Sequence, residues 1–436
     1  MTTKGLSSQS HKTIEEENKQ LKRAVEELSI LNDLARTIGA SLNTQEIIQT
    51  IVRRSLRAMH AEQGVITLVD IQQQGSMKTL VRTMVSSSDQ GQFHLDQALL
   101  GWMHLNKKPL VVNEPKTDTR FQGVPWDASI RSLIAVPMMV KSEVRGVLVV
   151  YNKKEGGTFS EDDQRLLAII ATQSAQVVEN ARLFENEQAF LLMQEDVRLA
   201  SRIQMELLPK EPPKIQGYDI AGITIPAEAV GGDYFDFIPI DEHRLAICLG
   251  DVSGKGLPAS LLMSNLQATL RGQTLPTSSP KECLTRSNQL LYRSTGPEKF
   301  ATVFYSILDV QNHTLSFSNA GHDNPYVLSL KHEPLRLKVG GIPLAMFGEF
   351  LYEEGTVALE PGETIVIYSD GITEAMNAAE EEFSEQRVEA VLCDHHLGSA
   401  KEIVDQLIAT AKAHAGDTPQ SDDMTIVVVK RLSEQA

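Results

Sequence analysis

The sequence predicts an α+β protein made of two domains and connecting helices. The chain has 436 residues, more than one compact core usually contains. Short β-type runs bounded by Gly, Pro and Asn fall into two groups, one in each half of the chain. Between the groups, apolar residues recur at heptad spacing, which indicates a helix.

Composition excludes several classes of protein. The formal net charge is −16, which argues against nucleic-acid binding because that requires clustered Lys and Arg. No apolar stretch is long enough for a membrane-spanning helix, and the N-terminus has no signal-peptide core. Cys248, Cys283 and Cys393 are too few and too scattered for a disulfide framework, so we expect a cytoplasmic protein.

Residues 12–38 are predicted to form the first helix. Ile14, Leu21 and Leu28 share one heptad position, and Ala24 and Leu31 share the other. The repeat is short, so a dimer helix and an ordinary amphipathic helix both remain open.

Residues 39–182 form the first predicted domain. A helix, IIQTIVRRSLRAMH, is followed by the runs GVITLVDI, MKTLVRTMV, KPLVV, SLIAVPMMV and VRGVLVVYN, and then by a second helix that starts near Ser160. This order predicts a sandwich of helices on an antiparallel sheet. Trp102 and Trp126 could line a pocket, although large aromatic residues are more often core.

This region resembles a GAF domain in its first helix, in LLGWMHLNKKPLVVNEPKTDTRF and in SLIAVPMMVKSEVRGVLVVYNKKEGGTFSEDDQRLLAIIATQSAQVVENA. The resemblance implies a sensory α/β sandwich. Such domains bind a small molecule or a protein, or simply dimerise, and the sequence does not choose between these roles.

Residues 183–209 are predicted to be a coiled-coil-like linker helix. Leu183, Phe190 and Val197 keep one heptad position, and Met193, Ala200 and Leu207 keep the other, until prolines follow. A helix transmits rotation or a change of register, so we expect it to couple the two domains, in a homodimer.

Residues 214–431 form the second predicted domain. Strand-type runs such as RLAICLGD, ATVFYSILDV, TIVIYSDG and MTIVVVK alternate with helical stretches such as ASLLMSNLQATLR and PKECLTRSNQLLYRS. This alternation predicts stacked antiparallel sheets, a β-sandwich flanked by helices.

Four segments of this domain place aspartates where an apolar strand meets a turn. They are AVGGDYFDF with Asp233 and Asp236, LGDVSGKG with Asp251, YSDGITEA with Asp370, and SDDMTIV with Asp422 and Asp423. A single such aspartate is ordinary turn chemistry. Four in one domain can converge, and either cations or helix N-termini would then have to offset their charge. Oxygen ligands suit Mg²⁺ or Mn²⁺.

The same segments resemble the SpoIIE/RsbU branch of the metal-dependent PPM (PP2C-like) phosphatases. The matching text includes ASRIQMELLP, AEAVGGDYFDF, LGDVSGKGLPASLLMSNLQATLR, FATVFYSILDVQNHTLSFSNAGHDNPYVL, PGETIVIYSDGITEAMN and QSDDMTIVVVK. Ala345 departs from the Gly that is usual in that family, and no Arg matches the phosphate-binding Arg of eukaryotic relatives.

The resemblance implies a site for two Mn²⁺ or Mg²⁺ ions. Carried over by position, Asp233 and Asp251 hold one ion. The other is held by Asp251, Asp370 and Asp422, with help from the Val252 carbonyl. Asp423 is expected behind Asp422, although the two adjacent residues could be exchanged in this assignment.

Other residues carry weaker signals. His322 could be a general acid or could stabilise a turn. Cys393, His395 and His396 invite a zinc interpretation but lack a second group of ligands. The Lys255 segment fails the spacing of a phosphate-binding loop, and Cys248 is expected in the core rather than as a nucleophile.

The predicted function is a metal-dependent protein serine/threonine phosphatase. The resemblance implies a phosphorylated STAS-type anti-sigma-factor antagonist as substrate, in a partner-switching pathway under control of the GAF-like domain. One alternative is a regulatory binding protein with the same fold and no turnover. Another is a diguanylate cyclase, because GGDYF imitates its signature, but Tyr234 stands at an acidic position and Asp251, Asp370 and Asp422 stay unexplained.

Overall fold

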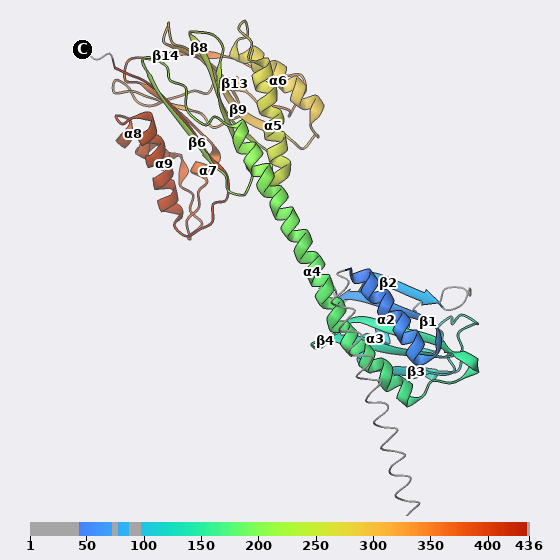
Figure 1. Cartoon of the computed structure of the whole chain (residues 1–436). Helices are drawn as coiled ribbons and strands as arrows, with labels where there is room; N and C mark the ends of the chain where they lie inside the picture. The colour runs from blue at the N-terminus through green and yellow to red at the C-terminus, as the bar shows by residue number, and fades with distance from the viewer. Residues whose placement is uncertain (1–42, 72–76, 87–96, 434–436) are drawn as a thin grey trace, which may run out of the picture. The chain divides into compact units, whose positions relative to one another are not determined.

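The structure is a computed structural model, and it describes residues 43–71, 77–86 and 97–433 (Figure 1). The helix predicted at residues 12–38 lies outside these ranges. The chain divides into two compact units, residues 1–192 and 193–436, and each is described by itself.

The first unit is built on one five-stranded antiparallel sheet with the strand order β2-β1-β5-β4-β3. The bounds are β1 Ala61–Ile71, β2 Met77–Ser86, β3 Leu110–Val112, β4 Leu133–Val140 and β5 Glu143–Lys153. Short 3-10 turns at Thr119–Phe121 and Lys154–Gly156 complete the unit. All five strand-type runs of this half are therefore strands.

Helices cover both faces of this sheet. Helix α2 (Thr44–Met59) begins at the N-cap Asn43, whose side chain accepts hydrogen bonds from the backbone N–H groups of Gln45 and Glu46. It packs with the first turns of α4 (Glu161–Leu207) over one face, and α3 (Gln97–Asn106) lies over the other. The sandwich predicted from the sequence is confirmed.

Trp102 and Trp126 lie on the α3 side of the sheet. Their rings lie 6.5 Å and 5.8 Å from the ring of Phe121, and both pack against the apolar core there. They contribute packing area to this core.

Helix α4 is continuous over 47 residues and ends two positions before Pro209. The helical connection predicted from the heptads is therefore present. Leu183, Phe190 and Met193 on it are 54%, 59% and 65% exposed. Within the described ranges, none of the helices combines the length and the apolar composition that crossing a bilayer requires.

The second unit contains two stacked sheets. The first has the order β13-β10-β9-β8-β7, with β14 added to β10, and the second has the order β12-β11-β15-β16-β6. The strands of the first sheet are β7 Tyr234–Pro239, β8 Arg244–Val252, β9 Ala301–Asp309, β10 Thr314–Ala320, β13 Gly340–Gly341 and β14 Gly355–Ala358. Those of the second are β6 Tyr218–Ile225, β11 Tyr326–Leu328, β12 Leu335–Arg336, β15 Thr364–Tyr368 and β16 Met424–Arg431.

Apolar side chains fill the space between the two sheets, with Phe235, Leu249 and Phe304 from one sheet and Ile367 and Val427 from the other. The outer face of the first sheet is covered by α5 (Gly256–Gln273) and α6 (Pro280–Ser294). The outer face of the second is covered by α7 (Asp370–Thr373), α8 (Ser384–His395) and α9 (Ala400–Ala415) (Figure 1). The predicted β-sandwich flanked by helices is confirmed, and the short strands β11 to β14 and helix α8 are additions that the sequence pattern did not reveal.

Candidate functional site

The predicted aspartates lie at the ends of strands from both sheets. Asp233 directly precedes β7 and Asp251 lies at the end of β8, where the pairing of Tyr234 with Gly250 makes the two aspartates neighbours. In the second sheet, Tyr368 pairs with Ile426. This register brings the start of α7, with Asp370, beside the residues that precede β16, Asp422 and Asp423.

Asp251 stands in the field of the other carboxylates. Its burial, and then the charges of Asp370, Asp422 and Asp423, raise the pKa of the Asp251 carboxyl to about 8. A carboxyl with this pKa keeps its proton at neutral pH unless a cation offsets the neighbouring charges. The second sheet therefore contributes directly to the electrostatics of a residue on the first.

Asp233 is the most deeply buried of the four predicted ligands. It is 4% exposed, and its Oδ2 atom has no hydrogen-bond partner. Burial, followed by the charge of Asp251, raises the pKa of Asp233 well above its usual range. A buried carboxylate oxygen without a partner is costly, and a cation is the partner that best satisfies it.

Asp370 and Val252 complete the predicted ligand set. Burial and then the charge of Asp422 raise the pKa of Asp370. Val252 is 1% exposed, and a Cβ atom added to Gly232 would lie 3.1 Å from the Val252 carbonyl oxygen and 3.2 Å from Asp251 Oδ1. The glycine therefore allows the loop before β7 to approach both groups.

Asp422 and Asp423 have different partners. Asp423 Oδ1 accepts a hydrogen bond from the Ala227 N–H at 2.8 Å, and its Oδ2 accepts bonds from Gly232 at 2.6 Å and Asp233 at 3.2 Å. Asp422 Oδ1 accepts only from the Asp423 N–H, and its Oδ2 lies 3.1 Å from Lys255 Nζ. Asp423 thus fixes the loop that carries Asp233, whereas Asp422 faces the pocket.

Two glycines make this arrangement sterically possible. A Cβ atom at Gly231 would lie 2.2 Å from Asp423 Oδ2, and one at Gly371 would lie 2.1 Å from the Asp423 carbonyl oxygen. Any side chain at either position would push the loop or helix α7 away from Asp423. The Gly-Gly-Asp and Asp-Gly sequences are therefore requirements of close packing around Asp423.

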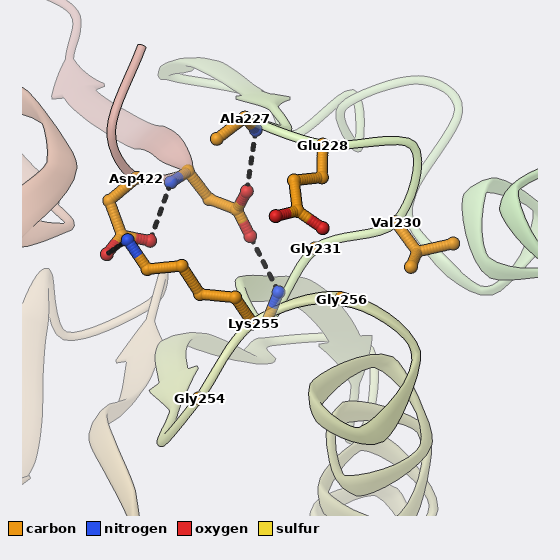
Figure 2. Close-up of a pocket in the computed structure, with 10 residues that line it drawn as sticks. Ala227, Glu228, Val230, Gly231, Gly254, Lys255, Gly256 and Asp422 are labelled. Atoms are coloured by element: carbon orange, nitrogen blue, oxygen red, sulfur yellow. Dashed lines mark hydrogen bonds and ion pairs between the residues drawn. The ribbon is translucent and has the colours of Figure 1, made fainter. Parts of the chain in front are cut away.

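A small pocket lies beside these groups, lined by the loop 227–232, the segment 254–256, Asp422 and Asp423 (Figure 2). As the side chains stand, the part of the chain that the structure describes contains no three His, Cys, Asp or Glu groups placed to hold one ion together. The charges of Asp370 and Asp422 nevertheless act on Asp251, and that of Asp422 acts on Asp370.

Two acidic residues near the site were not singled out from the sequence. Burial, then the charge of Asp370, raises the pKa of Asp323 to about 6. Burial and the same neighbour also raise the pKa of Glu374. Asp323 follows His322 in a loop, and Glu374 lies one helical turn after Asp370, a spacing that could have indicated it.

Asp236 does not belong to the group. It points to the helix layer, where Arg271 on α5 binds it through Nε at 2.6 Å and Nη2 at 3.0 Å. The hydroxyl of Tyr234 also donates to it at 2.6 Å. Asp236 is fully buried, so this ion pair ties β7 to α5.

The weaker candidates are structural. Burial lowers the pKa of His322 to about 4, so the ring is neutral near pH 7 and is no proton donor there. His396 Nδ1 lies 2.6 Å from the Cys393 carbonyl oxygen, and these residues form no metal cluster with other described side chains. Cys248 is buried in the core, and Ala345 adopts a left-handed φ of 67°.

Comparisons with known proteins agree with this architecture. The family described as Stage II sporulation protein E (SpoIIE) matches residues 241–432, and the GAF domain family matches residues 41–179. The chain consists of a GAF domain followed by a SpoIIE-type PPM domain. The resemblances noted in the sequence are thereby confirmed.

Relatives of the SpoIIE-type domain include proteins named as phosphatases. Phosphoserine phosphatase RsbU of Bacillus subtilis is 29% identical over 240 residues, which cover 54% of this chain and 70% of RsbU. Protein IcfG of Synechocystis is 29% identical over 260 residues, which cover 53% of this chain and 40% of IcfG. Among solved structures, the SiaA-PP2C domain of Pseudomonas aeruginosa superposes with a TM-score of 0.49 at 23% identity, covering 55% of this chain and 97% of that domain.

The raised pKa of Asp251 predicts a pH-dependent stability of the metal-free protein. The folded chain keeps a proton on Asp251 up to about pH 8, whereas the unfolded chain releases it near the ordinary value of 3.8. The folded state therefore binds more protons in this interval, and the free energy of unfolding falls as pH rises from about 4 to about 8. The slope reports the number of protons that the chain releases on unfolding. Asp251→Asn should lower this number by up to one, as measured by urea unfolding at several pH values in EDTA.

Asp241→Asn is the matched control, because Asp241 is a surface carboxylate whose pKa is lowered by Arg244. This variant should keep the wild-type slope over the same interval. An unchanged slope in Asp251→Asn would contradict the electrostatic description of the site.

Proposed function

We propose that the chain is a metal-dependent protein serine/threonine phosphatase. The observation that carries the proposal is the grouping of aspartates from four separate strand ends, where burial and then the charges of Asp370, Asp422 and Asp423 raise the pKa of Asp251 to about 8. Such a cluster is unfavourable without cations and is suited to binding them. The SpoIIE-type fold and the name of the RsbU relative support the same activity.

The oxygen ligands present are of the kind that two divalent ions would take, once the carboxylates had drawn together around them. Asp233, with its unpartnered Oδ2, would hold one ion together with Asp251, and Asp251, Asp370 and Asp422 would hold the other with the Val252 carbonyl. When bound, Mn²⁺ or Mg²⁺ would offset the carboxylate charge, attract the phosphate and lower the pKa of water.

The protein's own groups would set the geometry of this reaction. Asp423 has both carboxylate oxygens engaged by backbone N–H groups, so its part is to fix the loop that presents Asp233. Asp251 lies next to Asp233 on the first sheet, and the charges of Asp370 and Asp422 from the second sheet act on it. In this proposal Asp251 is shared by both ions.

Two other functions, a binding protein without turnover and a diguanylate cyclase, fit the chain less well. A binding protein without turnover would not need Asp233, Asp251, Asp370 and Asp422 together, and this chain has all four. For a cyclase, Tyr234 of GGDYF would have to face a nucleotide, but it is fully buried and bonded to Asp236.

The first test of the proposal measures phosphate release by the full chain with and without Mn²⁺ or Mg²⁺. Turnover should require the metal, and Asp251→Asn should lower kcat by at least about a hundredfold because both ions lose a ligand. Asp422→Asn should impair Mn²⁺ binding more than Asp423→Asn does, as measured by calorimetry. Asp423→Asn should instead loosen the loop 227–233 and lower thermal stability.

Asp241→Asn serves again as the control and should leave turnover and Mn²⁺ binding unchanged. Near-normal turnover in Asp251→Asn would exclude the two-ion assignment. If Asp423→Asn impaired Mn²⁺ binding more than Asp422→Asn did, Asp423 and not Asp422 would be the metal ligand.

The proposed substrate is a phosphoserine or phosphothreonine on a folded STAS-type anti-sigma-factor antagonist, whose dephosphorylation releases a sigma factor through partner switching. The sequence resemblance to the SpoIIE/RsbU branch supports this choice. Physically, a small pocket whose lining includes the acidic residues Glu228, Asp422 and Asp423 gives an anion little binding energy of its own, so contacts outside the pocket would be needed.

Substrate choice can be tested with one phosphoprotein and a short phosphopeptide from the same protein. We expect kcat/KM to be at least about a hundredfold higher for the folded protein, because docking contacts supply the binding energy that the site lacks. Initial rates of phosphate release at several concentrations give both values. Equal values would point to a broad phosphatase outside partner switching.

Regulation by the GAF domain is proposed to act through α4. At the C-terminal end of this helix, Gln204 donates to the Gly231 carbonyl at 2.6 Å and accepts from the Gly231 N–H at 3.0 Å. Gln267 on α5 also donates to the Leu207 carbonyl at 2.7 Å. A rotation or shift of α4 would therefore reach the loop that carries Asp233.

The exposed apolar side chains of α4 support a homodimer in which two such helices pair. Leu183, Phe190 and Met193 are each more than half exposed on a helix of 47 residues. A parallel pair would bury them, as heptad positions do in coiled coils. A small-molecule or protein signal at the GAF domain could then alter the register of the pair.

Phe190→Gln tests this coupling, with Glu187→Gln on the same exposed stretch as its control. We expect Phe190→Gln to weaken the dimer in sedimentation experiments and to change basal turnover by about fivefold, within the usual range of coupling between sites. The Mn²⁺ affinity should stay at the wild-type value because Phe190 touches no ligand. Identical turnover in both variants would make α4 a spacer and would require another route for the signal.

A further inference from the structure

Lys255 stands at the edge of the pocket, immediately before α5. Its Nζ atom lies 3.1 Å from Asp422 Oδ2 and donates to the Ser421 carbonyl at 2.6 Å (Figure 2). The side chain is 53% exposed, so it can leave this position without breaking any core packing. The spacing of the glycines around Lys255 does not match the sequence of a phosphate-binding loop. The position of Lys255 beside the pocket is the feature that suggests a role.

The pocket is otherwise poor in positive charge. Of the described residues that line it, Lys255 is the single basic one, whereas Glu228, Asp422 and Asp423 are acidic. An entering phosphate would therefore be repelled by the walls of the pocket unless Lys255 or bound cations oppose them. Helix α5 adds a smaller favourable contribution, because its 18 residues begin at Gly256 with no side chain capping the first turn.

We infer that Lys255 binds the phosphoryl group of the substrate and the phosphate product, an inference that rests on the proposed phosphatase function. The ammonium group on a flexible four-carbon stem suits a tetrahedral anion, to which it offers three donors.

The contact with Asp422 gives Lys255 two possible positions, one paired with Asp422 and one turned toward a phosphate in the pocket. In the structure, Lys255 is the counter-ion of Asp422, and a half-exposed pair of this kind adds little stability. A divalent ion held by Asp422 would offset the charge that holds the lysine. The ammonium group could then turn into the pocket toward a phosphate, so Lys255 would couple metal binding to phosphate binding.

Inorganic phosphate is the probe for the test, titrated into the full-length Mn²⁺-loaded protein and followed by calorimetry. Lys255→Met should weaken phosphate binding by about tenfold or more, since a charged hydrogen bond is lost. Lys255→Arg should recover most of the affinity. Lys281→Met is the matched control, because Lys281 is 48% exposed and pairs with Glu354 at 3.5 Å on the surface of α6; it should bind phosphate as the wild type does.

Mn²⁺ titration of the same metal-free proteins provides the second measurement. Lys255→Met should bind Mn²⁺ as tightly as the wild type or more tightly, because Asp422 loses a competing cation. A phosphate Kd within twofold of wild type in Lys255→Met would overturn the inference, as would a weakened Mn²⁺ affinity. Lys255→Gln should reproduce the results of Lys255→Met, and a variant that fails to do so would equally contradict a role for the charge.

The role of Lys255 and the phosphatase function can be disproved independently of each other. A wild-type protein that hydrolyses phosphoserine, with phosphate binding insensitive to Lys255, would contradict only the role of this lysine. A wild-type protein that binds phosphate through Lys255 but releases none from any phosphoprotein would contradict only the phosphatase function.

Discussion

Repulsion between carboxylates at one end of the β-sandwich is the constraint around which the second unit is organised. Burial, and then the charges of Asp370, Asp422 and Asp423, raise the pKa of Asp251 to about 8, and Asp233 is buried beside it with an oxygen that has no partner. Such a group costs folding free energy that the apolar core between the sheets has to offset. Buried ionisable groups that lower the stability of the fold are common at functional sites, where their perturbed pKa values are needed.

Asp423 shows how the chain limits that cost. Its carboxylate spreads its charge over three backbone N–H groups of the loop 227–233, which satisfies it without a cation. The same three bonds fix the loop from which Asp233 projects, and Gly231 leaves the space they need. Lys255 plays the corresponding part for Asp422, but through a single exposed contact that a stronger cation can replace.

The loop that Asp423 fixes is also held from the other side by Gln204 of α4. One short segment therefore exchanges two hydrogen bonds with the last turns of a long helix and donates three to Asp423, which directly precedes β16. A change in α4 has a direct physical route to Asp233 through these bonds. To move a population from about 1% to 99% active takes about 5.5 kcal/mol, and paired helices that change register are better able to supply this than one ligand contact.

The sequence alone determined the α+β class, the helical connection and the four aspartate-bearing strand ends, because these depend on local periodicity and turn chemistry. For example, α6 begins at Pro280 and ends at Ser294, as its sequence predicts. The tertiary structure decided which aspartate of each segment faces the site. Asp236 turns to Arg271, and Asp423 binds Gly232, which lies 191 positions away. The nearness of Lys255 to Asp422 and of Asp323 to Asp370 also arises only when the two sheets stack. No local pattern encodes these contacts, because each joins segments whose spacing along the chain is set by the fold and not by the period of a helix or strand.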